Sequence, residues 1–142
     1  MSSKQSRTYF QIQRTAALLQ RAADAALLEA AGVTAAQAAV LTIVETLGSA
    51  KQKQLAEILH QNESAITQMV AKLEGQGLVE RAVSPYDRRI KEVRCTQSGR
   101  QARDEAERAF NSINLDLDEA LGAESREFLE QLQRIRAIFP KK

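Results

Sequence analysis

Two short amphipathic segments joined by residues 60–62, the last of which also caps the second segment, restrict the fold of this chain more than any other feature. Residues 62–76 carry apolar side chains at separations of three and four, which predicts a helix with one buried face. These side chains are Ile66, Met69, Val70 and Leu73. Residues 51–59 predict a shorter helix with inward residues at Leu55, Ile58 and Leu59. Because only residues 60–62 separate the two helices, they have to cross at a steep angle, as in a helix-turn-helix.

The outer face of the longer helix is short and polar. Its outward residues are Glu63, Ser64, Thr67, Gln68 and Lys72. Asn62 is a suitable N-cap and Gly77 a suitable C-terminal glycine, so both ends of this helix are specified locally. Taken alone, such a face indicates an ordinary solvated helix surface. The segment that follows it changes that interpretation.

A basic β-hairpin is predicted directly after this helix. Residues 78–83 and 91–95 have the composition of two short strands. In the loop between them, Pro85 stands at the second position of Ser84–Asp87, which predicts a type I turn there. Arg88 and Arg89 follow, either in an ordinary exposed loop or as contacts to a polyanion. A polar helix beside a positively charged hairpin favours a DNA-reading surface.

The rest of the chain predicts long helices, so we expect a mostly α fold with one small β-hairpin. A first helix over about 7–31 ends at Gly32, and Thr34 with Gln37 forms a capping box for the next helix. That helix is expected to bury Val40, Leu41, Val44 and Leu47. A further helix begins after Thr96, and a last one follows Gly122. A helix of about 25 residues is roughly 37 Å long, more than so small a domain can bury alone. Part of its apolar stripe is therefore available to a second copy of the chain.

Charge is distributed unevenly along the sequence, although the formal net charge is only +2. Residues 51–100 hold nine Lys and Arg against six Asp and Glu, whereas residues 101–139 hold five Arg against nine acids. A polyanion is therefore expected to approach the centre of the chain.

Several function classes find no support in the sequence. No apolar run reaches the roughly 18 residues of a membrane span, and the first residues lack the apolar stretch of a secretory signal, which predicts a cytoplasmic protein. One cysteine and one histidine are too few for a disulfide or a zinc site. We find no nucleophile–base arrangement and no glycine-rich phosphate loop, so neither an enzyme nor a cofactor is predicted.

Five stretches in register resemble the signature of MarR-type transcriptional regulators. They are residues 54–57, 66–74, 77–81, 87–89 and 93–99. The resemblance is close from Thr34 to Arg100, and the flanking helices agree in length and order. It implies a winged helix-turn-helix domain at 33–100 flanked by a helical dimerisation region at 1–32 and 101–142. Many relatives have glycine where His60 stands, at a turn that often needs a positive φ, which histidine tolerates.

The resemblance further implies a homodimer that binds double-stranded DNA at a pseudo-palindromic operator. The longer helix would enter the major groove, and the hairpin tip, with Asp87 holding Arg89, would reach the adjacent minor groove. DNA-binding roles are thereby implied for Asn62, Ser64, Ala65, Thr67, Gln68, Lys72, Asp87, Arg88 and Arg89. It also implies a repressor that responds to a small effector, aromatic or phenolic in kind. The alternative is a protein-interaction module that kept the fold and lost operator binding, a hypothesis that Glu63 and the modest central charge motivate.

Two further features have competing interpretations. One branch of the family senses peroxides through a cysteine near the start of its first helix, where this chain has none. Cys95 instead stands where an inward strand residue is expected, which predicts a buried, inert thiol. Tyr9, Phe10, Phe110 and Phe128 could line an effector pocket, but packing in the core or in a dimer is the favoured interpretation.

Overall fold

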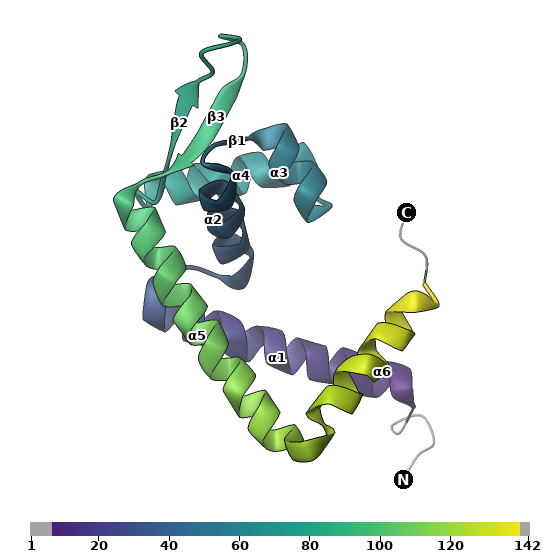
Figure 1. Ribbon diagram of the computed structural model, residues 1–142. Helices are drawn as coiled ribbons and strands as arrows, with labels where there is room; N and C mark the ends of the chain where they lie inside the picture. Colours follow the sequence, from purple (N-terminus) through teal and green to yellow (C-terminus); the bar gives the residue numbers. More distant parts are fainter. Residues whose placement is uncertain (1–6, 140–142) are drawn as a thin grey trace. The chain divides into compact units, whose positions relative to one another are not determined.

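The computed structural model describes residues 7–139, which form a mostly helical fold with one small sheet (Figure 1). The chain divides into two compact units, with the boundary between Ala109 and Phe110. In chain order, the elements are α1 (Thr8–Ala31), α2 (Ala35–Leu47), β1 (Ala50–Lys51), α3 (Gln52–Leu59), α4 (Glu63–Gly75), β2 (Val79–Val83), β3 (Lys91–Cys95), α5 (Gln97–Leu121), a short 3-10 turn (Gly122–Glu124) and α6 (Ser125–Ala137). The predicted fold class is thereby confirmed.

The core of the first unit forms where α2, α3, α4 and β3 meet. Its largest wholly buried side chains are Leu27, Leu41, Leu55, Ile66, Leu73, Val33, Val40, Val44, Val70 and Val93. All four helices from α1 to α4 contribute to this set, so α4 is held from behind by the apolar face that its sequence predicts.

Two residues predicted to be buried are exposed instead. Leu47 is 44% exposed and Ile58 is 45% exposed. Each lies on the apolar stripe of its own helix, but Leu47 is the last residue of α2 and Ile58 the penultimate residue of α3. α3 has only eight residues and buries Leu55 and Ala56. Helical spacing therefore identifies the face correctly but not the point at which the core ends.

The sheet has three antiparallel strands in the order β1-β3-β2 (Figure 1). Val79 pairs with Cys95 and Val83 pairs with Lys91, which confirms the predicted hairpin. β1 was not predicted, since Lys51 was expected to begin the next helix, yet Ala50 pairs with Val93 and Lys51 with Glu92, which extends the sheet. Two residues are too few for any periodic signal, and their strand conformation depends on the neighbouring β3.

The predicted helix ends are confirmed at several positions. Gln37 N–H donates to Thr34 Oγ1 at 3.2 Å and Thr34 N–H donates to Gln37 Oε1 at 2.9 Å, which completes the capping box. Gly77 has a φ of 75°, and the N–H of the next residue, Leu78, donates to Leu73 O at 3.0 Å, as in a Schellman motif. At the start of α5, Gly99 N–H donates to Thr96 Oγ1 at 3.0 Å.

Large apolar side chains are exposed on the long helices. In α1 only Ala23 and Leu27 are buried, while Tyr9 and Leu18 are 66% and 53% exposed. In the second unit, which holds the end of α5 and all of α6, Leu115, Leu129 and Phe139 are 69%, 57% and 67% exposed. Packing in the core of a single chain is therefore the wrong interpretation for Tyr9, while dimer packing stays a prediction.

Among the described residues, no single helix is long and apolar enough to cross a membrane. α1 and α2 reach the required length and hydropathy only when taken together, and the chain bends by 61° between them.

Candidate nucleic-acid interface

α4 presents a polar face to solvent because its opposite face is anchored in the core. Ile66, Val70 and Leu73 are fully buried. The residues predicted to contact DNA on this helix lie on the other side: Ser64, Thr67, Gln68 and Lys72 are exposed, and Ala65 is half-buried. Asn62 is also exposed, and its Oδ1 accepts a hydrogen bond from Ala65 N–H at 2.7 Å. It therefore caps the helix as predicted.

The turn before α4 fixes the angle at which this helix is presented. His60 has a φ of 54°, in the left-handed region, which places the one histidine in a turn as its sequence position predicts. The N–H of Gln61 donates to Ala56 O at 3.0 Å, so the turn is bonded to the end of α3. Ala56 is 6% exposed, and its small side chain allows α3 and α4 to pack closely.

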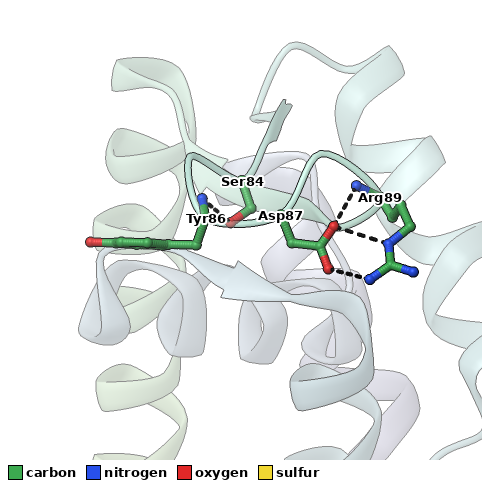
Figure 2. A network of polar contacts seen from close by, with 4 residues as sticks. All are labelled: Ser84, Tyr86, Asp87 and Arg89. Carbon is green, nitrogen blue, oxygen red and sulfur yellow. Dashed lines mark hydrogen bonds and ion pairs between the residues drawn. The ribbon is translucent and has the colours of Figure 1, made fainter.

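The wing consists of β2, β3 and the loop 84–90 between them, and its tip holds Arg89 in a fixed orientation (Figure 2). Asp87 Oδ1 accepts from Arg89 N–H at 3.0 Å and from Arg89 Nε at 3.2 Å, and Asp87 Oδ2 accepts from Nη2 at 3.1 Å. The side-chain hydrogen bond from Arg89 keeps the pKa of the Asp87 carboxyl below its usual range. The Arg89 side chain is still 90% exposed. An exposed ion pair contributes little stability, so the effect of this pair is to orient the guanidinium.

The loop that carries this pair is itself ordered by hydrogen bonds. Ser84 is only 3% exposed, its N–H donates to Ile90 O at 2.8 Å, and its Oγ accepts from Tyr86 N–H at 3.2 Å. The hydrogen-bonded turn closes between Asp87 and Ile90, where Ile90 N–H donates to Asp87 O at 3.0 Å. The loop also bends at Pro85 and Tyr86, inside the predicted turn Ser84–Asp87, so the hydrogen-bonded turn at Asp87–Ile90 is a second turn that the sequence did not predict.

Arg88 and Tyr86, the neighbouring large side chains of the tip, are both exposed. Arg88 is exposed and makes no ion pair within residues 7–139. Tyr86 is 94% exposed and points away from Arg89 across the loop (Figure 2).

An ion pair that sequence reasoning missed joins α4 to the wing. Arg81 of β2 donates to Glu74 of α4 through Nη2 at 2.8 Å and through Nε at 3.3 Å. The hydrogen bond lowers the pKa of Glu74 and raises the pKa of Arg81. Two parallel bonds fix direction as well as distance, so the base of the wing is oriented relative to α4. The seven-residue separation across Gly77 gave no periodic signal for this contact.

Cys95 is not one of the exposed residues of this surface, and its thiol is buried and unreactive. It is 8% exposed, its Sγ lies 3.5 Å from Leu41 O, and burial raises its pKa to about 11. The prediction of a buried thiol is confirmed.

A short helix pair that presents a polar second helix, together with a three-stranded sheet whose hairpin is tipped by an arginine, defines a winged helix-turn-helix protein. The model of the MarR family matches residues 33–91, so this part of the chain is similar to that family. This match confirms the resemblance predicted from the sequence over these residues.

Three known proteins place the chain among its relatives. The HTH-type transcriptional repressor MdtR of Bacillus subtilis (strain 168) is 36% identical over 72 residues, which are 51% of this chain and 46% of that protein. The match therefore spans less than half the length of this curated relative. The crystal structure of a MarR family transcriptional regulator from Rhodococcus sp. RHA1 has a TM-score of 0.74 at 25% identity and covers 93% of this chain and 94% of that one. A MepR-like protein complexed with pseudoligands has a TM-score of 0.68 at 29% identity over 89% and 92% of the two chains.

Proposed function

We propose that this protein is a sequence-specific transcriptional repressor that binds a pseudo-palindromic operator as a homodimer. The observation that carries the proposal is the exposed polar face of α4 beside a wing whose arginine is oriented before any DNA is bound. Neither feature stabilises a single folded chain to any large extent, since exposed polar groups and surface ion pairs contribute little. Both suit a protein that contacts a duplex in adjacent grooves.

The proposed division of roles follows from the chemistry of each side chain. Gln68 can bond bidentately to adenine through N6 and N7, and Ser64 can meet a phosphate. Lys72 and Arg88 are suited to phosphates as exposed cations. Arg89 suits a narrow, electronegative minor groove, because a guanidinium is less strongly hydrated than an ammonium. Ala65, half-buried on the helix, would offer its methyl group to a thymine methyl.

Homodimerisation is proposed from the exposed apolar side chains of the long helices. They include Tyr9, Phe10, Leu18 and Leu28 on α1 and Phe128, Leu129, Ile138 and Phe139 at the C-terminal end. Large apolar side chains exposed in this number favour an interface with a second chain. Two recognition helices related by a twofold axis would contact half-sites about 34 Å apart, one turn of duplex. The helical regions 1–32 and 101–142 are the proposed dimerisation region, and 33–100 the proposed DNA-binding domain.

Selection of duplexes from a random pool, followed by titration of the selected site, tests the proposal. Arg89→Ala should weaken binding by about 1–3 kcal/mol, or roughly 5- to 150-fold, without lowering the unfolding midpoint. Arg108→Ala removes the same charge from an exposed position on α5 and is the matched control. Asp87→Asn should cost less than Arg89→Ala, because the arginine remains but is no longer held. Equal losses for Arg89→Ala and Arg108→Ala would contradict the role of the wing.

The alternative, a protein-interaction module on the same fold, rests on Glu63. This acidic side chain is exposed in the first turn of α4, where it would meet the phosphates of a bound duplex. If no duplex binds at low salt and a protein partner is captured through the polar face of α4, this alternative is correct. Glu63→Gln distinguishes the two, since it should strengthen DNA binding and weaken binding to a basic partner.

A small effector, aromatic in kind, is proposed by analogy with the MepR-like protein that was crystallised with pseudoligands. A ligand that prefers the native state raises its stability. A thermal-shift screen of phenolic and other aromatic acids should therefore yield at least one stabilising compound that also lowers the affinity for the selected duplex. A screen without such a compound would argue for constitutive binding.

A further inference from the structure

Gln52 connects the two helices of the helix-turn-helix at their outer side. It is the first residue of α3 and is half-buried. Its Nε2 donates to Thr67 Oγ1 of α4 at 3.2 Å, across fifteen residues of sequence. Thr67 is one of the side chains that α4 presents to solvent, so this hydrogen bond lies on the proposed DNA-binding surface itself.

The Thr67 hydroxyl already donates a hydrogen bond within α4. Its single hydrogen is given to Glu63 O, at 2.8 Å, one turn earlier in the helix. A hydroxyl has one hydrogen and two acceptor lone pairs. With the hydrogen on Glu63 and one lone pair on Gln52, Thr67 Oγ1 retains one acceptor position and no donor.

The two hydrogen bonds already made by the Thr67 hydroxyl restrict what this residue can recognise. Phosphate oxygens only accept hydrogen bonds, so Thr67 cannot bond to a phosphate in this arrangement. In the major groove the donors are the amino groups of adenine and cytosine, whereas guanine N7 and O6 and thymine O4 accept. The remaining acceptor of Thr67 therefore suits an amino-bearing base. Ser64 lacks such an arrangement within residues 7–139 and keeps its donor for a phosphate.

We propose that Gln52 is a positioning residue that fixes Thr67 as a hydrogen-bond acceptor and thereby sets a preference for adenine or cytosine at one base pair of each half-site. The inference rests on the proposed DNA-binding function and adds a residue of α3 to a surface otherwise assigned to α4 and the wing. Gln52 itself retains its amide oxygen and a second N–H, which can bond to an adjacent base or phosphate.

The test is a double-mutant cycle read at single base pairs. Wild-type protein and the variants Gln52→Ala, Thr67→Val and Gln52→Ala with Thr67→Val are titrated against the selected duplex and against duplexes changed at one base pair at a time. In the wild type, replacing the amino-bearing base should weaken binding about five- to tenfold at one position. Gln52→Ala should reduce the ratio of the affinities for the selected and the changed duplex to below about twofold at that position. The corresponding ratios at other positions should be unchanged. In the Thr67→Val background, Gln52→Ala should have no further effect on the ratio at that position.

Gln97→Ala is the matched control, because Gln97 is also the first residue of a helix and is exposed. Each variant is checked by urea unfolding, so a fold-wide defect would appear as a lower midpoint together with equal losses at every base pair. If the wild type discriminates between base pairs and Gln52→Ala retains every ratio, the inference is overturned and the proposed function stands. If the wild type binds all duplexes equally, the proposed function fails first. In the free protein, Thr67→Val should also shift the NMR signals of the Gln52 side-chain amide, and unchanged signals would contradict the hydrogen bond.

Discussion

Replacing Gly99 with alanine should destabilise the protein far more than a single added methyl group suggests. Gly99 lies in the first turn of α5, where the helix meets the start of the hairpin. A Cβ at this position would clash with Leu78 O and lie 2.9 Å from Leu78 C, both backbone atoms. Backbone atoms cannot rotate out of the way as a side chain does. The start of α5 would therefore have to move by about 1 Å, as overpacked positions require.

The expected change in the free energy of unfolding follows from the contacts that such a movement disturbs. Overpacking alone costs about 1–3 kcal/mol. Thr96 N–H donates to Leu78 O at 3.1 Å and Thr96 Oγ1 donates to Gly77 O at 2.7 Å, and each strained hydrogen bond is worth about 1 kcal/mol. Alanine recovers about 1 kcal/mol through its higher helix propensity. Gly99→Ala should thus lower the free energy of unfolding by about 2–4 kcal/mol.

Gly75→Ala is the matched control for this change. Gly75 is also helical, is not in the positive-φ region, and has no atom within 4 Å of a Cβ built on it. It should keep the wild-type stability or raise it by up to about 1 kcal/mol. Urea unfolding followed by circular dichroism at one fixed protein concentration measures both, since the stability of an oligomer depends on concentration. Equal stability of the two variants would refute the argument from the close approach at Leu78.

Three other predictions concern single residues. Cys95, with its pKa raised to about 11, should resist iodoacetamide at pH 8 in the native protein and react fully in urea; rapid native labelling would show that the thiol is accessible. Because the pKa of Glu74 is lowered, its ion pair stabilises the fold above the unfolded pKa of about 4.3 and loses this effect as pH falls through the folded value. The stability difference between wild type and Arg81→Met should therefore be largest near pH 7 and vanish at acid pH, and a constant difference would point to packing alone. His60→Gly should raise the free energy of unfolding by about 1 kcal/mol and His60→Val should lower it, because φ is 54° there; the reverse order in urea unfolding would contradict that conformation.

The features that the sequence predicted are those that depend on residues close to one another in the chain. Thr34 and Gln37 specify their capping box three residues apart, and Gly77 closes α4 without help from distant residues. The buried face of α4 follows from helical spacing. The hairpin strands follow from composition and alternation, and the observed β2 and β3 agree with them.

The features that were missed depend on contacts between distant segments. β1 is a strand only because β3 pairs with it, and Ile58 is exposed at the end of α3 although helical spacing places it on the apolar stripe. The hydrogen bond from Gln52 to Thr67 and the ion pair of Glu74 with Arg81 join residues on different elements. No local pattern specifies such pairs, because many exposed polar residues have equal propensity to form them.

The central claim is that α4 and the wing together read a DNA sequence, and an anisotropy titration tests it most directly. A labelled duplex from upstream of the gene is compared with a shuffled duplex of the same length and composition, at several salt concentrations. We expect binding by two chains per duplex, a preference of at least about 10³-fold for the upstream sequence and a steep loss of affinity with salt. Equal affinity for the two duplexes at every salt concentration would contradict the claim.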